Sequence, residues 1–158
     1  MHFLSTLSLA LSVFASAQAM TPAIVAPADG AHIAPGQTFD FAYQSIADYG
    51  ASSYNYSVYL FTVPPENLLA SQNFAAGHYF GRFAEPNYPG NPNPSNLPPA
   101  TLVMPNFSIA PGGFGAGASA SNATFYFAVF EEYSTGEGVP GNRLSFLYNR
   151  VIYNATSN

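Results

Sequence analysis

The sequence predicts an all-β protein, an antiparallel immunoglobulin-like β-sandwich of about six to eight strands. Several short segments alternate apolar and polar residues, as half-buried strands do, and Gly- and Pro-rich turns separate them. After residue 20, no run of twelve or more residues shows helical periodicity. The chain has no cysteine, so we expect its 14 Phe and 11 Tyr to stabilise the core by burial.

The first nineteen residues are expected to be a secretory signal peptide. An apolar run begins at Phe3 and is followed by the small-x-small sequence Ala17-Gln18-Ala19, which is typical of a cleavage site. The run is too short to cross a bilayer, which takes about 20 residues. We therefore expect residues 20–158 to be exported as a single domain, without membrane insertion, either released or associated with a cell wall.

In the first half of that domain, residues 24–26 and 33–35 are short apolar segments between Pro and Gly turns. Residues 38–43 alternate with period two, which predicts a half-buried strand. Residues 53–62 begin in the same way but become apolar on both faces, which favours a central position in a sheet.

Residues 63–99 interrupt this pattern. Prolines cluster in residues 84–99, which predicts one long Pro/Asn-rich loop, because proline removes a backbone donor and fixes φ. Residues 71–83 could form one short strand or an irregular loop. The aromatic residues of the segment give it apolar surface to bury, so we expect it to be ordered.

In the second half, residues 100–104 and 107–109 predict short strands, and residues 124–133 form the most apolar strand, buried on both faces until Glu131. Residues 144–153 form the closing strand. Two apolar sets within it compete for the inward face, and a bulge would reconcile them. One set is Leu147, Val151 and Tyr153, and the other is Leu144, Phe146 and Tyr148.

Composition and charge restrict the function. Charged residues are 7% of the chain and the net charge is −5, which argues against binding nucleic acid or anionic membranes. Glu131 and Glu132 are adjacent on a strand, so they point to opposite faces and cannot flank one glycosidic bond unless the strand breaks there. We expect them to be solvated carboxylates at a strand end. His78 lacks a ligand pattern around it, and no metal, cofactor or catalytic residue is predicted.

Two groups of residues are candidate sites. Asn-x-Ser/Thr sequons predict N-glycosylation in a eukaryotic host, with unused sequons as the alternative; they are at Asn55, Asn106, Asn122 and Asn154. Aromatic residues in or beside predicted loops are candidate binding residues, because exposed rings stack on sugars or anchor a protein partner. They are Tyr49, Tyr79, Phe80 and Tyr88, and ordinary core packing is the alternative.

Segments at the two ends of the domain resemble known families. The opening pattern is Ile24-x-x-Pro27 followed by Ile33-x-Pro35-Gly36-x-x-Phe39-x-Phe41. The closing segments are Phe130-Glu-Glu-Tyr133 and Leu144-Ser-Phe-Leu-Tyr-Asn-Arg-Val-Ile152. Together they resemble the necrosis-inducing secreted effector family of plant-associated fungi. The opening pattern is also similar to the Ser/Thr-rich cell-wall domain linked to β-1,6-glucan synthesis. The first resemblance implies interference with host immune signalling through protein binding, and the second implies association with glucan.

The sequence thus predicts a secreted, non-catalytic fungal glycoprotein that acts by extracellular binding. An effector-like protein binder is the first interpretation, and a cell-wall polysaccharide binder or wall-associated structural protein is the alternative. A glycan hydrolase is the least favoured.

Overall fold

The computed structural model describes residues 21–48, 51–65, 76–86, 94–107, 122–136, 138 and 140–153. In these residues the chain is all-β, as predicted, and no helix occurs that could span a membrane. The strands are β1 (Ala23–Ala26), β2 (Ala31–Ile33), β3 (Thr38–Asp40), β4 (Ala42–Gln44), β5 (Ala47–Asp48), β6 (Ala51–Phe61), β7 (Ala76–Ala84), β8 (Thr101–Val103), β9 (Ala123–Thr135) and β10 (Arg143–Tyr153).

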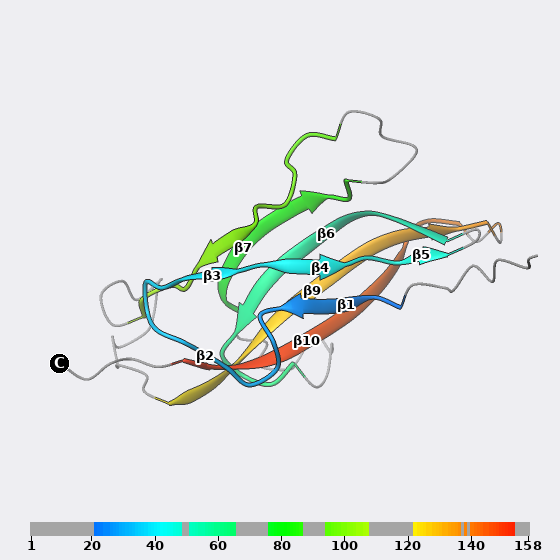
Figure 1. Cartoon of the computed structure of the whole chain (residues 1–158). Coiled ribbons are helices and arrows are strands. Elements are labelled where there is room, and N and C mark those ends of the chain that lie inside the picture. The colour runs from blue at the N-terminus through cyan, green and yellow to red at the C-terminus, as the bar shows by residue number, and fades with distance from the viewer. Residues whose placement is uncertain are drawn as a thin grey trace, which may run out of the picture.

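The largest sheet has the strand order β2-β10-β9-β6-β5, and β7 also pairs with β6. Among its long strands, β9 pairs antiparallel with both β6 and β10 (Figure 1). Strands β6 and β9 both lie inside the sheet, and for β6 this confirms the central position predicted for residues 53–62.

A front layer crosses this sheet and consists of the pairs β1-β4 and β3-β8 (Figure 1). The strand predicted at residues 38–43 is divided at Phe41, whose N–H donates to the carbonyl of Ala100 at 2.9 Å. The chain changes partner there, from β8 to β1. Such breaks explain why the described residues contain ten strands, more than expected, six of them only two to four residues long.

One edge of the large sheet departs from the predicted antiparallel arrangement, because β2 pairs parallel with β10. The turn before β2 is held against that strand: Gly30 N–H donates to the Arg150 carbonyl at 2.7 Å, and Asp29 accepts from the Arg150 backbone at 2.7 Å. Hydrogen bonds from Arg150 also lower the pKa of Asp29 to about 2. The expectation of a purely antiparallel fold is therefore wrong at this edge.

The core lies between the front layer and the large sheet. Phe39 and Phe41 of the front layer each meet Phe127 of β9 with ring centroids 5.8 Å apart and strongly inclined planes. Such edge-to-face contacts add to the burial of large rings. The buried cluster is made up of Ile33, Phe39, Phe41, Tyr56, Val58, Leu60, Phe83, Leu102, Met104, Phe125, Phe127, Val129, Val151 and Tyr153.

The closing strand β10 has no bulge toward β9, and its register is continuous from Arg143 to Tyr153. Val151 and Tyr153 are buried on the inner side, whereas Tyr148 is exposed on the other. The bulge expected from the sequence is therefore wrong. Both apolar sets are accommodated because both faces of the sheet carry aromatic residues.

Residues 76–84 of the ambiguous segment form strand β7, so the strand alternative is the one observed. Its pairing with β6 shifts register between Val58 and Tyr59, beside Gly81, whose φ of +148° favours glycine. Phe107 lies in a turn rather than at the start of a strand, and residues 108–109 lie outside the described residues.

Candidate functional site

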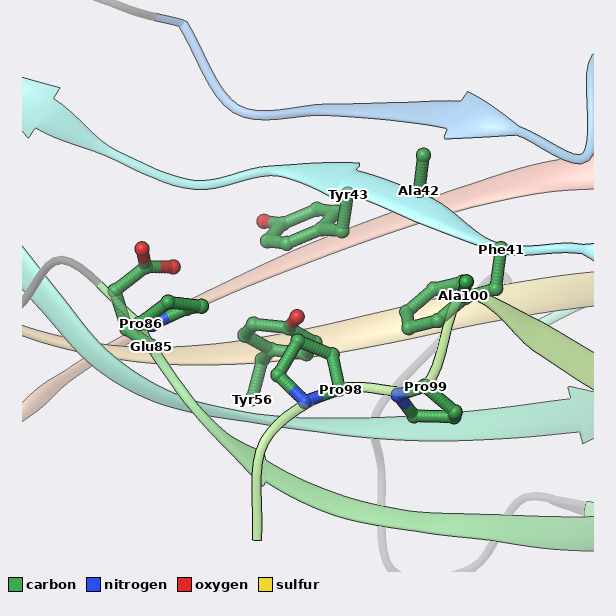
Figure 2. Close-up of a pocket in the computed structure, with 9 residues that line it drawn as sticks. All are labelled: Phe41, Ala42, Tyr43, Tyr56, Glu85, Pro86, Pro98, Pro99 and Ala100. Atoms are coloured by element: carbon green, nitrogen blue, oxygen red, sulfur yellow. The ribbon is translucent and has the colours of Figure 1, made fainter. Parts of the chain in front are cut away.

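A pocket of about 300 Å³ opens beside the front layer, where the chain leaves β7 and enters β8 (Figure 2). Its described lining combines aromatic rings, prolines and one carboxylate. These residues, which we call the proline-rimmed pocket, are Phe41, Ala42, Tyr43, Tyr56, Glu85, Pro86, Pro98, Pro99 and Ala100.

Backbone hydrogen bonds hold the walls of the proline-rimmed pocket. Glu85 N–H donates to the carbonyl of Tyr54 at 2.9 Å, which ties the end of β7 to β6. The neighbouring Ala84 N–H donates to the carbonyl of Asn96 at 3.0 Å, which brings the proline segment alongside. The pocket therefore rests on regular sheet structure, although part of its rim is proline-rich.

Tyrosine rings form one wall of the proline-rimmed pocket. The ring centroids of Tyr43 and Tyr56 are 4.9 Å apart, and Phe41 lies 6.3 Å from Tyr56. Burial, followed by the charge of Glu85, raises the pKa of Tyr56 well above its usual range. Burial and then the charge of Glu131 do the same to Tyr43. Both hydroxyls therefore stay protonated at physiological pH.

Glu131 is fully buried behind this tyrosine wall. Its carboxylate accepts hydrogen bonds from the Tyr43 hydroxyl at 2.8 Å, the Ile46 N–H at 2.7 Å and the Ser145 hydroxyl at 3.0 Å. The predicted solvated position is therefore wrong for Glu131. The reason is tertiary: β4 and the residues that follow it lie against this end of β9 and supply two of the three donors, the Tyr43 hydroxyl and the Ile46 N–H.

Glu132 points to the opposite face, as strand alternation predicts. It forms a two-pronged ion pair with Arg82 of β7, with both N–O distances at 2.7 Å. The hydrogen bond from Arg82 lowers the pKa of Glu132. Since Glu131 does not line the proline-rimmed pocket, Glu85 is the one carboxylate among the described residues that do.

The face of the large sheet away from the front layer carries a second feature, a continuous row of aromatic rings. Neighbouring centroids are 4.5–5.9 Å apart along the row from Tyr79 to Tyr126, and the row crosses β7, β6, β9 and β10. We call this the outer aromatic face; it consists of Tyr59, Phe61, Tyr79, Tyr126, Phe130, Phe146 and Tyr148.

Parts of the outer aromatic face are open to solvent. Tyr79 is 50% exposed and Tyr148 is 42% exposed, and Leu144, on the same side of β10, is 66% exposed. The rings are inclined to one another by 37° between Tyr59 and Tyr79 and by 80° between Tyr126 and Tyr148. Phe61, by contrast, is only 1% exposed. The rings that reach solvent thus form an uneven apolar surface rather than a flat one.

The structure separates the predicted binding aromatics. Tyr79 joins the outer aromatic face, but the next residue, Phe80, turns inward and lies 5.6 Å from Phe127. This is the ordinary alternation of a strand, in which successive side chains point to opposite faces. Phe80 itself has no partner in the β6 ladder, because the pairing shifts register between Tyr79 and Gly81. Tyr49 and Tyr88 lie outside the described residues.

The sequence reasoning missed the contribution of β10 to the outer aromatic face. The available signal is the second apolar set of that strand, Leu144, Phe146 and Tyr148, which the sequence presents as an alternative inward face. Both faces of this strand can be apolar, because one apolar set packs in the core and the other forms part of the outer aromatic face.

The sequons occupy different environments. Asn55 is half-buried in β6, opposite Glu132, and Asn106 is half-buried before a turn. Asn122 is exposed immediately before β9, with a φ of +52°. Asn154 lies outside the described residues. Exposure therefore favours Asn122 as an accessible acceptor, and glycosylation at all four stays a prediction.

His78 packs against Phe80 with ring centroids 4.7 Å apart, and burial lowers its pKa. Among the described residues, no group of three or more His, Asp or Glu side chains is arranged to bind a metal ion. The histidine thus has a packing role in this structure.

Neither a protein-family model nor a curated protein sequence matches the chain.

Proposed function

We propose that the protein is exported after removal of residues 1–19, folds as an immunoglobulin-like sandwich, and acts as a non-catalytic, effector-like protein binder of a fungus. The observation that carries this proposal is the outer aromatic face. The signal-peptide pattern and the resemblance to secreted effectors support the extracellular setting. N-glycosylation, first of all at Asn122, completes the proposal.

The outer aromatic face has the composition of a protein-binding surface. Tyr and Phe are enriched at the centres of protein interfaces, where charged residues are depleted. Beside the rings, Arg82 is paired with Glu132 and Arg150 with Asp29, so these outward charges are compensated. Exposed apolar side chains that are grouped together are typical of an interaction site.

A protein partner fits this surface better than a polysaccharide does. Stacking on a flat sugar chain favours rings that lie in one plane, and neighbouring rings here are inclined by up to 86°. An uneven surface of this kind matches the knobs and hollows of protein side chains, which pack into each other at interface density.

The carboxylates support a non-catalytic function. Glycoside hydrolysis uses two carboxyl groups on either side of one bond. Glu131 is buried under three hydrogen bonds, and Glu132 lies on the other face in an ion pair. Neither of them lines the proline-rimmed pocket with Glu85.

The proposal is tested by offering the mature protein two kinds of partner. We expect it to stay in solution with insoluble β-glucan, chitin and cellulose, to release no reducing sugar, and to form a saturable complex with an extracellular protein of the host. Saturable retention on one of the polysaccharides, without a protein complex, would show that the wall-binding alternative is the correct one.

A further inference from the structure

Strand β10 lies at the margin of the large sheet, and one of its edges is open along most of its length (Figure 1). On one side it pairs with β9 from Arg143 to Tyr153. On the other side β2 pairs only with residues 151–153, and the β1–β2 turn bonds the backbone of Arg150. In the part of the chain that the structure describes, no strand pairs with residues 143–149 on that side. We call these residues the open edge of β10.

The directions of the backbone groups at the open edge of β10 follow from strand alternation. The Arg150 N–H donates to Asp29 and the Arg150 carbonyl accepts from the Gly30 N–H, so both groups point away from β9. The register with β9 is continuous, so every second residue before Arg150 directs its N–H and C=O the same way. These residues, which offer three donors and three acceptors in a row, are Leu144, Phe146 and Tyr148.

The open edge of β10 lacks the features that usually keep sheet edges from pairing. Such edges are blunted by short strands, bulges, prolines or charged side chains. Strand β10 has eleven residues, no proline and no bulge toward β9, and residues 144–149 include no charged side chain. Leu144 is 66% exposed and Tyr148 is 42% exposed beside this edge. An edge with this composition is a template for another strand.

We propose that the open edge of β10 pairs with the same edge of a second copy of the chain, antiparallel and about a two-fold axis at Phe146. In this register Phe146 lies opposite itself, and Leu144 lies opposite Tyr148 of the second copy. The three outward donors and three outward acceptors of each copy are then all used. A register centred on another residue places at least one of these three residues opposite a position outside the set.

The side chains of the open edge of β10 favour a second copy over a foreign strand. On the outer aromatic face the row Leu144, Phe146, Tyr148 meets its own reverse, so all three cross-strand pairs are apolar or aromatic. At the end of the pairing Arg143 lies opposite Asn149 of the second copy, so no like charges meet. The pairing stops there because the β1–β2 turn occupies the next residue. The outer aromatic faces of the two copies then form one continuous surface.

Sedimentation of the purified mature protein, with no other protein present, tests the proposal. Three residue pairs on each side make a contact smaller than a standard interface, so the dimer should be weak. We expect it to be largely dissociated at about 1 µM and clearly populated at about 100 µM. A protein that stays monomeric up to about 500 µM would overturn the proposal, and the open edge would then be left to a foreign strand.

Two double variants test the register. In Leu144→Lys with Tyr148→Lys, each lysine lies opposite a lysine of the second copy; in Leu144→Lys with Tyr148→Glu, each lysine lies opposite a glutamate. The two positions are about 13 Å apart within one strand, so these pairs form only between copies. Like charges opposite each other destabilise a strand pair, whereas opposite charges stabilise it. We therefore expect the Lys/Glu variant to dimerise at least about tenfold more tightly than the Lys/Lys variant.

Net charge alone would act in the other direction. The Lys/Lys variant adds two positive charges to a net charge of −5, which reduces repulsion between copies, whereas the Lys/Glu variant leaves the net charge unchanged. Val103→Thr, at an exposed position of β8, is the control and should leave the dimer unchanged within about twofold. Both double variants change exposed side chains, and circular dichroism checks that they are folded.

Equal dimerisation of the two folded double variants, or tighter dimerisation of the Lys/Lys variant, would overturn the assignment of the open edge of β10. The assay contains one protein only, so its outcome does not depend on the partner proposed for the outer aromatic face.

Discussion

Replacing Glu131 by alanine is expected to lower the free energy of unfolding by about 3–5 kcal/mol. The change leaves three donors without their acceptor: the Tyr43 hydroxyl, the Ile46 N–H and the Ser145 hydroxyl. A buried donor without a partner costs about 1–3 kcal/mol. Because a domain of this size has about 5–15 kcal/mol of stability in total, the variant should be close to unfolded. Urea unfolding followed by far-ultraviolet circular dichroism measures the change.

The matched control is Glu132→Ala, the same substitution one residue later. Glu132 forms a partly exposed ion pair with Arg82, and such pairs contribute about 0.2–1 kcal/mol. Tyr43→Phe removes a single charged hydrogen bond and should cost about 1.5–3 kcal/mol, so it stays folded and measurable. Equal effects of Glu131→Ala and Glu132→Ala would contradict the buried network.

Replacing both Tyr79 and Tyr148 by threonine is expected to weaken binding of the protein partner by at least about 100-fold. Interface tyrosines at the centre of a contact each contribute about 2 kcal/mol or more, and 1.4 kcal/mol is a factor of ten in affinity. The two rings are about half exposed, so the free energy of unfolding should fall by less than about 2 kcal/mol. Threonine is used because it keeps the preference for strand structure.

The control for that double variant is Val25→Thr with Val103→Thr. These valines are 59% and 54% exposed and lie on β1 and β8 of the front layer. Their replacement removes exposed apolar surface from the other layer and should leave partner affinity unchanged. If the valine variant lost affinity and the tyrosine variant kept full affinity, the partner would bind at the front layer, and the proposed interface on the outer aromatic face would be wrong.

Local periodicity predicted much of the fold. Strand β6 was recognisable as central because apolar residues fall on both of its faces, and this pattern needs no tertiary information. Strand β7 was ambiguous because its alternation breaks at Phe80, where the pairing with β6 shifts register. The parallel pairing of β2 also depends on a long-range contact, between Asp29 and Arg150, that local patterns do not contain.

The candidate sites were harder to predict for the same reason. Glu131 reads locally as a polar residue near a strand end, but its partners Tyr43 and Ile46 are 88 and 85 residues away in the sequence. Glu85 is followed by prolines and was assigned to a loop, whereas its burial results from the approach of the segment before β8. Among the binding candidates, Tyr79 lies on the outer aromatic face because its position in β7 is opposite Tyr59.

The central claim is that the outer aromatic face is the surface that meets the partner. Hydroxyl-radical footprinting of the mature protein, with and without its bound protein partner, measures this directly. We predict that Tyr79, Tyr148 and Leu144 lose reactivity in the complex, whereas Val25 and Val103 keep theirs. Protection of the two valines with unchanged reactivity of the three outer residues would contradict the account.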